Sequence, residues 1–251
     1  MAYRKKKFPH RVFIWGIFLL LCFLIPNSKA NPQTIYNTYL PIIFKPRSHY
    51  YAQVTKSGIF YGVWATIQTA DPVIREPLFS YASINILDDY GRWVETGWIK
   101  GSITGCVPKF TWAIQPGSVN IISYPLPSVG IAYQYRIHKI SNGNWTLTIM
   151  RTDGTVIQSV NIYNPGMDYG SSLQAVGEVD SVSKINDMGV SGILSLKWRD
   201  VNLFWFNWDG WNYGVIDNPP YHIVGIQSNP YNNVQIYGNN GNPIPPGAPC
   251  P

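Results

Sequence analysis

Short segments in which apolar and polar residues alternate occupy most of this 251-residue chain between residues 58 and 226. Gly, Pro, Asn and Asp separate these segments at intervals of about 8 to 12 residues, a spacing typical of antiparallel β-proteins. A period of two puts neighbouring side chains on opposite faces of a strand, whereas a helix needs a period of about 3.6. We find no convincing helical pattern, so the sequence predicts an all-β sandwich or barrel.

Residues 88–91, 141–144 and 153–154 contain the glycine or asparagine that hairpin turns need for a positive φ. Neither an internal repeat nor a change in composition divides residues 58 to 240, which favours one domain. The strands are expected at residues 59–69, 79–87, 92–100, 109–114, 130–139, 145–150, 156–162, 172–180, 192–198, 201–208 and 221–226.

The N-terminus has the pattern of a secretory signal peptide. Basic residues gather in residues 1–11, residues 12–25 carry no charge, and Ser28 and Ala30 are small residues at the two positions that a signal peptidase recognises. We expect a signal peptide over residues 1–30 and a secreted, extracellular product. An uncleaved membrane anchor is the alternative, although a span usually needs about 20 apolar residues.

Beyond the signal peptide we expect three segments. Residues 31–56 resemble an extended linker with little core of its own, residues 57–240 form the predicted β-sandwich domain, and residues 241–251 form a Pro-rich tail. The tail contains too much proline to pack by itself.

The formal net charge of +6 comes from the signal peptide alone. Residues 1–30 contain six of the 19 basic residues and none of the 13 acidic ones, so 13 of each remain after cleavage. A formally neutral product gives no support to a nucleic-acid partner or to an anionic membrane surface. We therefore expect no nucleic-acid partner and, after signal cleavage, no membrane partner.

Two cysteines, Cys106 and Cys250, remain after the loss of Cys22. In an oxidising compartment two thiols favour one disulfide. A Cys106–Cys250 bridge would attach the Pro-rich tail to the loop around Cys106. The alternative is two unpaired cysteines.

Histidines are few, and only His138 and His222 lie in the predicted domain, because His49 falls in the predicted linker. A serine or cysteine triad needs a histidine base, and no Gly-x-Ser-x-Gly turn is present. The chain also lacks HExxH, DxDxDG and P-loop patterns, so we expect no metal site and no cofactor.

Carboxylates are the remaining candidates. Glu95 lies within an aromatic and β-branched strand, where burying an unpaired charge costs several kcal/mol. Of the other two glutamates, Glu178 occupies a similar strand 83 residues later. A sandwich can bring two such strands together, and one carboxyl can then activate water while the other stabilises an oxyanion. Two independent surface glutamates are the alternative.

Five short segments share their order along the chain with the motifs of a known family. They are Gly62-Val63-Trp64-Ala65, Phe79-Ser80, Glu95-Thr96-Gly97-Trp98, Val176-Gly177-Glu178-Val179 and Met188-Gly189-Val190-Ser191-Gly192. The first three resemble the Gly-x-x-Ala, Phe-Ser and Glu-Ala-Gly-Trp strands of the neprosin domain. The last two resemble its Gly-Gly-Glu strand and its Met-Gly-Ser-Gly element, here with one inserted residue. The resemblance to the neprosin domain and the related eqolisins covers about residues 58 to 227.

This resemblance implies a two-sheet antiparallel, lectin-like β-sandwich (a jelly roll) that acts as a glutamic peptidase. Glu95 and Glu178 would be the catalytic pair, with Trp64, Trp93 and Trp98 as walls of the substrate groove. Eqolisins have glutamine at the first position, in a Gln-Thr-Gly strand similar to Glu95-Thr96-Gly97. The chain departs from the neprosin pattern at Val176, where that family has glycine, and in its sparser cysteines and shorter preceding segment.

Three functions are therefore considered. The first is a secreted endopeptidase that hydrolyses polypeptides at acidic pH with a pair of glutamates. The second is a non-catalytic, lectin-like sandwich that binds a polysaccharide or cell-wall polymer, because ten tryptophans and seventeen tyrosines exceed the needs of its core. The third is a purely structural exported protein.

Overall fold

The computed structural model describes residues 48–75, 78–115, 117–141, 143–181, 186–210, 213–226, 231–238 and 250. The predicted signal peptide, residues 31–47 of the predicted linker and residues 241–249 of the predicted tail lie outside these described residues, so they stay predictions. Among the described residues, no helix is both long enough and apolar enough to cross a membrane.

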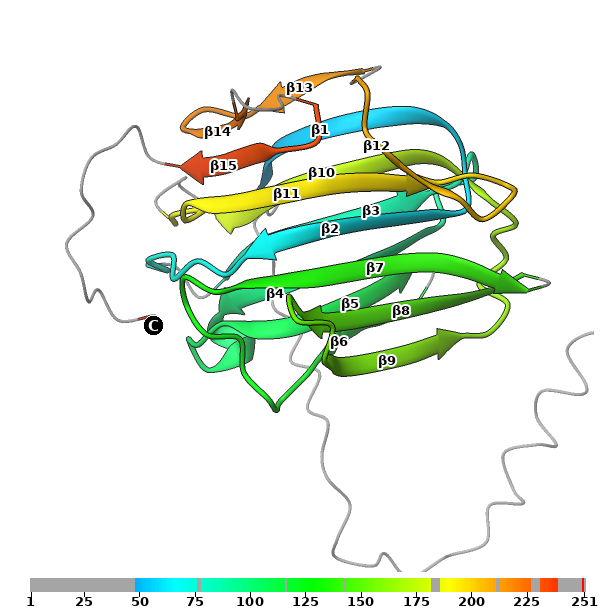
Figure 1. Cartoon of the computed structure of the whole chain (residues 1–251). Coiled ribbons are helices and arrows are strands. Elements are labelled where there is room, and N and C mark those ends of the chain that lie inside the picture. The colour runs from blue at the N-terminus through cyan, green and yellow to red at the C-terminus, as the bar shows by residue number, and fades with distance from the viewer. Residues whose placement is uncertain are drawn as a thin grey trace, which may run out of the picture. The chain divides into compact units, whose positions relative to one another are not determined.

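Two antiparallel sheets form the described part of the chain, as Figure 1 shows. One has seven strands in the order β13-β1-β10-β3-β4-β5-β6, and the other has eight in the order β14-β15-β11-β2-β7-β8-β9, with β12 paired to β11. The strands are β1 (Ser48–Phe60), β2 (Gly62–Gln68), β3 (Phe79–Leu87), β4 (Trp93–Gly101), β5 (Lys109–Gln115), β6 (Val119–Ile121), β7 (Ala132–Ser141), β8 (Asn144–Arg151), β9 (Val156–Ile162), β10 (Gly170–Ser181), β11 (Ser191–Arg199), β12 (Trp205–Asn207), β13 (Tyr213–Asp217), β14 (Tyr221–Gly225) and β15 (Val234–Gly238).

The core lies between the two sheets. Alternate residues of each strand point inward, as Val63, Ala65 and Ile67 do on β2 and as Ile84 and Ile86 do on β3, and all five are fully buried. Burying an aliphatic side chain of this size stabilises the fold by roughly 1.5–3 kcal/mol. The period-two pattern therefore arises from side chains that alternate between the core and the outer face of each strand. The predicted all-β, two-sheet antiparallel sandwich is confirmed.

Strand β1 corrects the predicted linker at residues 48–56. These residues pair with β10 on one side and with β13 on the other. Ala52 and Val54 are fully buried in the core, whereas Tyr51 and Gln53 lie on the outer face. The inward residues Ala52 and Val54 are small, so they give only a weak strand signal in the sequence, and tertiary packing decides the structure of this segment.

Other differences concern strand ends and short strands. Residues 201–204 were predicted to begin a strand, but they form a turn in which Leu203 has a φ of 72°, and β12 starts at Trp205. Strands β6, β13 and β15 were not predicted, and each is only three to five residues long.

The predicted disulfide between Cys106 and Cys250 is present. Cys106 follows a short 3-10 helix, η2 (Ser102–Thr104), which continues directly from β4. The bridge therefore joins the C-terminal end of the chain to the loop after the strand that carries Glu95.

Candidate active site

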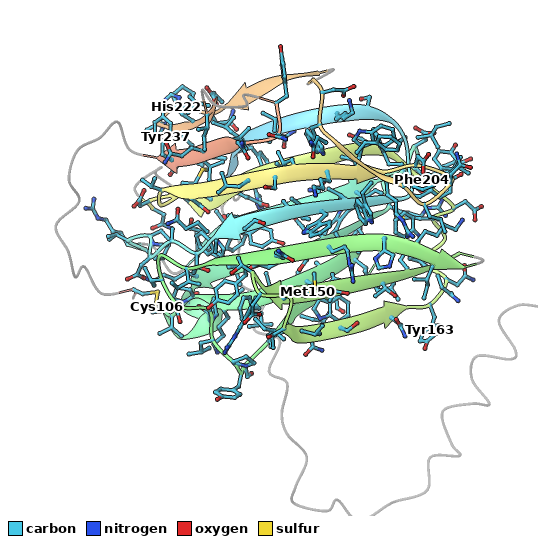
Figure 2. The ribbon with its side chains drawn as sticks, viewed as in Figure 1. Cys106, Met150, Tyr163, Phe204, His222 and Tyr237 are labelled. Carbon is cyan, nitrogen blue, oxygen red and sulfur yellow. A yellow bond between two sulfur atoms is a disulfide. The ribbon has the colours of Figure 1, made fainter. Side chains whose placement is uncertain are left out.

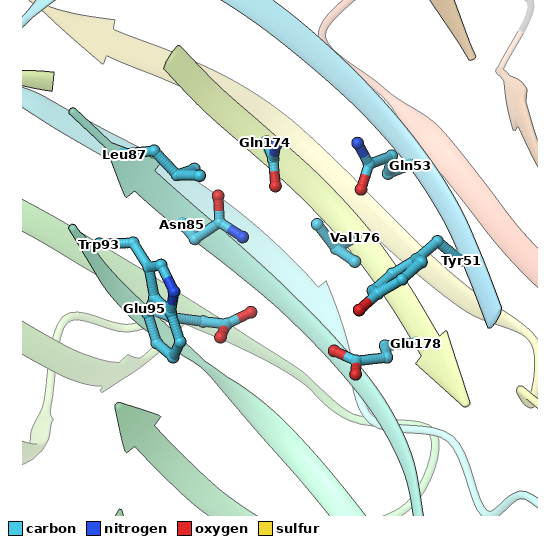
Figure 3. A pocket seen from close by; sticks show the side chains of 9 residues that line it. All are labelled: Tyr51, Gln53, Asn85, Leu87, Trp93, Glu95, Gln174, Val176 and Glu178. Carbon is cyan, nitrogen blue, oxygen red and sulfur yellow. The ribbon is translucent and has the colours of Figure 1, made fainter. Parts of the chain in front are cut away.

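Glu95 and Glu178 lie on the outer face of the seven-stranded sheet, on the two strands that flank β3. Glu178 of β10 is paired with Tyr81, and Glu95 of β4 is paired with Asn85, four residues further along β3. Because four is an even number, both side chains point to the same face. Figure 3 shows their carboxyl groups pointing toward one another.

Two adjoining cavities, of about 200 Å³ and about 390 Å³, share four of their lining residues: Tyr51, Trp93, Glu95 and Glu178. The smaller cavity adds three amide side chains, Gln53, Asn85 and Gln174. The larger cavity is lined mainly by apolar side chains, which include Phe79, Tyr81, Ile99, Ile103 and Val119. A few convergent polar groups beside an apolar hollow are characteristic of small-molecule and peptide sites.

Glu95 is buried, with 8% of its surface exposed. Ser83 Oγ donates a 2.5 Å hydrogen bond to Glu95 Oε1. Burial, followed by the nearby charge of Glu178, raises the pKa of Glu95 to about 7, although hydrogen bonds from Ser83, Asn85 and Tyr81 act in the opposite direction. Glu95 is therefore a neutral carboxylic acid in acidic solution, and it can donate a hydrogen bond.

Glu178 has a different surrounding. Its Oε1 lies 2.5 Å from Nδ1 of His49, a residue of β1. Tyr51, also on β1, is directly opposite Glu178, and burial followed by the charge of Glu178 raises the pKa of Tyr51 to about 12. A protonated imidazole favours an ionised carboxylate beside it, and the neutral Tyr51 hydroxyl is a hydrogen-bond donor.

Sequence reasoning missed His49 and Tyr51 because both fall in the segment predicted to be a linker. A signal was available in the alternation of Tyr51, Gln53 and Thr55 with Ala52 and Val54. Asp180, two residues after Glu178 on the same strand, is buried and lies opposite His49.

Gly97 lies between the two carboxylates and has no side chain to fill the groove there. It is paired with Ser83 on β3, between the positions of Tyr81 and Asn85. A Cβ atom at Gly97 would lie 1.9 Å from the backbone oxygen of Ala82, closer than any real contact. Glycine is therefore required for β4 to approach β3 here.

The structure corrects two of the three predicted groove tryptophans. Trp93 lines both cavities, as expected. Trp98 is an odd number of residues away from Trp93, so it points into the core, where it is fully buried and its Nε1 donates a 3.0 Å hydrogen bond to Gln68 O. Trp64 is on β2, in the other sheet, and does not line either cavity.

Among the described residues, no group of three or more His, Cys, Asp or Glu side chains is arranged to hold a metal ion. The chemistry of this groove can therefore be considered from its two carboxyls, His49, Tyr51 and Ser83.

Comparison with known proteins gives a likeness of fold. No protein-family model and no curated protein sequence matches the chain. A solved structure of scytalido-glutamic peptidase with a peptide-based transition-state analogue is similar, with a TM-score of 0.54 and 12% identity over 77% of this chain and 100% of that one. The structure of SCP-B, a member of the eqolisin family of peptidases, in complex with the tripeptide Ala-Ile-His has a TM-score of 0.50, 12% identity and the same coverage.

At this level of identity the likeness concerns the fold: the chain has an eqolisin-like β-sandwich. The resemblance to neprosin stays a prediction.

Proposed function

We propose that this protein is an exported glutamic endopeptidase that uses Glu95 and Glu178. The observation that carries the proposal is the position of these two carboxyls in one groove, with one carboxyl in a setting that favours its neutral form. The likeness of fold to glutamic peptidases supports the same reaction class. Peptide-bond hydrolysis needs a base that removes a proton from water and a hydrogen-bond donor to the carbonyl oxygen, and the two carboxyls can supply these groups.

In the proposed mechanism, ionised Glu178 removes a proton from a water molecule, whose oxygen attacks the carbonyl carbon of the substrate. Neutral Glu95 donates a hydrogen bond to the carbonyl oxygen, which becomes the oxyanion of a tetrahedral intermediate. Glu178 then returns its proton to the amide nitrogen, the carbon–nitrogen bond breaks, and an acid and an amine are released. Ser83 holds the Glu95 carboxyl in place by its hydrogen bond.

His49 has a positioning role in this mechanism. Its imidazole contacts Glu178 Oε1 and orients that carboxyl beside Glu95. Because its pKa is about 7, Glu95 is neutral in weakly acidic solution and serves as the hydrogen-bond donor. Glu178 is therefore the carboxyl that we assign as the base.

The test is hydrolysis of a denatured protein by the purified chain between pH 3 and pH 8. Glu178→Gln should lower kcat/KM at least about 100-fold, because glutamine cannot accept the proton of water. In Glu95→Gln the side-chain amide still donates a hydrogen bond and does not titrate. The activity of this variant should therefore persist above pH 7, where the wild type loses activity. Asp153→Asn, which neutralises an exposed acid in the turn between β8 and β9, is the matched control and should behave like the wild type.

Full activity of Glu178→Gln would contradict the assigned base. The absence of hydrolysis by the wild type, together with binding to a polysaccharide in the groove, would instead support the non-catalytic, lectin-like alternative.

A further inference from the structure

The outer face of the eight-stranded sheet, which faces the reader in Figure 1, carries a second cluster of functional side chains. The residues of this cluster lie in two neighbouring rows, each of which runs across paired strands. In the first row Lys197, Trp64 and Arg136 lie side by side on β11, β2 and β7. In the second row Arg199, Gly62 and His138 occupy the same three strands. We call this cluster, together with Trp205, the cationic face.

Indole rings lie among these cations. Trp205 of β12 packs over Gly62, where a Cβ atom would be 3.0 Å from its ring, and meets Trp64 edge to face at 5.7 Å. Lys197 Nζ lies 4.7 Å from the centre of the Trp64 ring. The Arg199 guanidinium is 5.7 Å from the Trp205 ring. The cations are therefore held at fixed positions on a rigid aromatic base.

Two cations of the cationic face lack acidic partners. Lys56, Arg92, Lys100 and Lys139 each pair with an aspartate, but none of the ion pairs between described residues involves Arg136, Lys197 or Arg199. The charge of Asp200 acts on Arg199, although the Asp200 carboxylate accepts the backbone N–H of Phe204. The charges of Arg136 and Lys197 are thus without an acidic partner within the described part of the chain.

Two buried nitrogen atoms at the centre, Arg136 Nε and His138 Nδ1, have no hydrogen-bond partner in the described structure. Burial, followed by the charges of Arg136 and Arg199, lowers the pKa of His138 to about 4, so His138 is neutral and the positive charge here is that of the two arginines. The buried Arg136 N–H without a partner and the like charges of Arg136 and Arg199 both cost free energy, and an oxyanion at this position would reduce both costs.

The same two rows continue with neutral polar side chains. The first row is extended by Asn207 on one side and by Ser159 on the other, with the buried Thr148 between Arg136 and Ser159. The second row is extended by Thr146 and Asn161. Each row crosses six strands, a length of about 24 Å at the usual strand spacing of about 4.8 Å. Hydroxyl and amide groups beside indoles suit the hydroxyls and ring faces of sugars, and a row of this length accommodates several units of a polymer.

We propose that the cationic face is a binding site for an acidic polysaccharide whose units carry carboxylate or sulfate groups. Arg136 and Lys197 bind the oxyanion above Trp64, and the neutral side chains of the two rows contact the sugar hydroxyls. This site lies on the opposite sheet from Glu95 and Glu178, so it holds the protein on a charged polymer while the groove stays open.

The experiment measures binding of the purified chain to polygalacturonate and to dextran sulfate. Fully methyl-esterified polygalacturonate and unmodified dextran are the neutral counterparts. The variant is Arg136→Gln/Lys197→Gln, because Arg199 also donates to Lys139 O and Leu203 O and supports the fold. Arg151→Gln/Lys109→Gln is the control for charge, since Arg151 is an exposed residue at the far end of β8 and Lys109 lies on the other sheet.

We expect at least one of the two acidic polymers to bind, with affinity about tenfold or more above its neutral counterpart. Arg136→Gln/Lys197→Gln should lose about tenfold or more of that affinity and keep the wild-type melting temperature, whereas the control pair should bind as the wild type does. Polygalacturonate binding alone would assign carboxylate as the ligand, and dextran sulfate binding alone would assign sulfate. Glu178→Gln should bind normally.

Four results would overturn the proposal: binding to neither acidic polymer, equal binding to the neutral polymers, equal loss in the control pair, or tighter binding to a single-stranded oligonucleotide than to either polymer.

Discussion

At the residue scale, the difference between Glu95 and Glu178 arises from what touches each carboxyl. Glu95 is buried beside Ser83, and its raised pKa favours the neutral form, whereas Glu178 contacts the imidazole of His49. Two residues of the same type therefore have different surroundings in one groove, which is what the proposed division into donor and base requires.

Glu95 should make the stability of the protein depend on pH. Its pKa is about 7 in the folded protein and 4.5 in its ordinary state. Because the folded value is the higher one, the stabilising effect is complete below pH 4.5 and is lost as the pH rises to about 7, by about 3 kcal/mol. Urea unfolding between pH 4 and pH 8 measures this change. Glu95→Gln should remove that pH dependence, and a variant with the wild-type slope would contradict it.

His49→Gln should lower kcat for the proposed hydrolysis more than it raises KM, because the Glu178 carboxyl loses the imidazole contact that orients it. Steady-state kinetics of the variant and of the wild type measure the two parameters. An unchanged kcat, or a loss of kcat that accompanies a lower melting temperature, would show that His49 has no positioning role.

At the element scale, strand alternation made much of the fold predictable. Strands β3 and β9 have the predicted bounds, and the turn at residues 88–91 has Gly91 at a φ of 75°. Alternation also shows that Glu95 and Trp93 share a face. It could not show that β1 lies beside β10, because strand order depends on contacts between residues more than 100 positions apart. The partners of Glu178 were missed for this reason.

Gly97→Ala tests the close approach of β4 and β3. The added methyl group would lie 1.9 Å from Ala82 O, so the strands must separate, and we expect a loss of more than about 2 kcal/mol of stability and of most activity. Gly192→Ala on β11 is the matched control, because its nearest contact would be 3.6 Å. Melting curves of both variants measure the effect. Equal stability of the two variants would show that β4 tolerates the side chain.

At the scale of the whole molecule, the sheet order brings distant segments to one face. β10 and β4 are far apart in the sequence, yet β3 joins them, and β1 adds the residues that contact Glu178. The fold class followed from composition and periodicity, whereas the set of groove residues required the sheet order.

The Cys106–Cys250 disulfide closes a loop of 144 residues. Crosslinking a loop of this size restricts the unfolded chain, so Cys106→Ser/Cys250→Ser should lose about 2–5 kcal/mol of stability. Chemical denaturation of the wild type, with and without a reducing agent, gives the same comparison without mutation. Identical midpoints in all three samples would show that the bridge does not stabilise the fold.

The bridge also lies next to the groove, because Ile103, three residues before Cys106 (labelled in Figure 2), lines the larger cavity. Glu95 and Glu178 lie instead on the two strands that pair with β3. A change at the bridge would therefore alter the apolar wall of the larger cavity before it alters the separation of the two carboxyls.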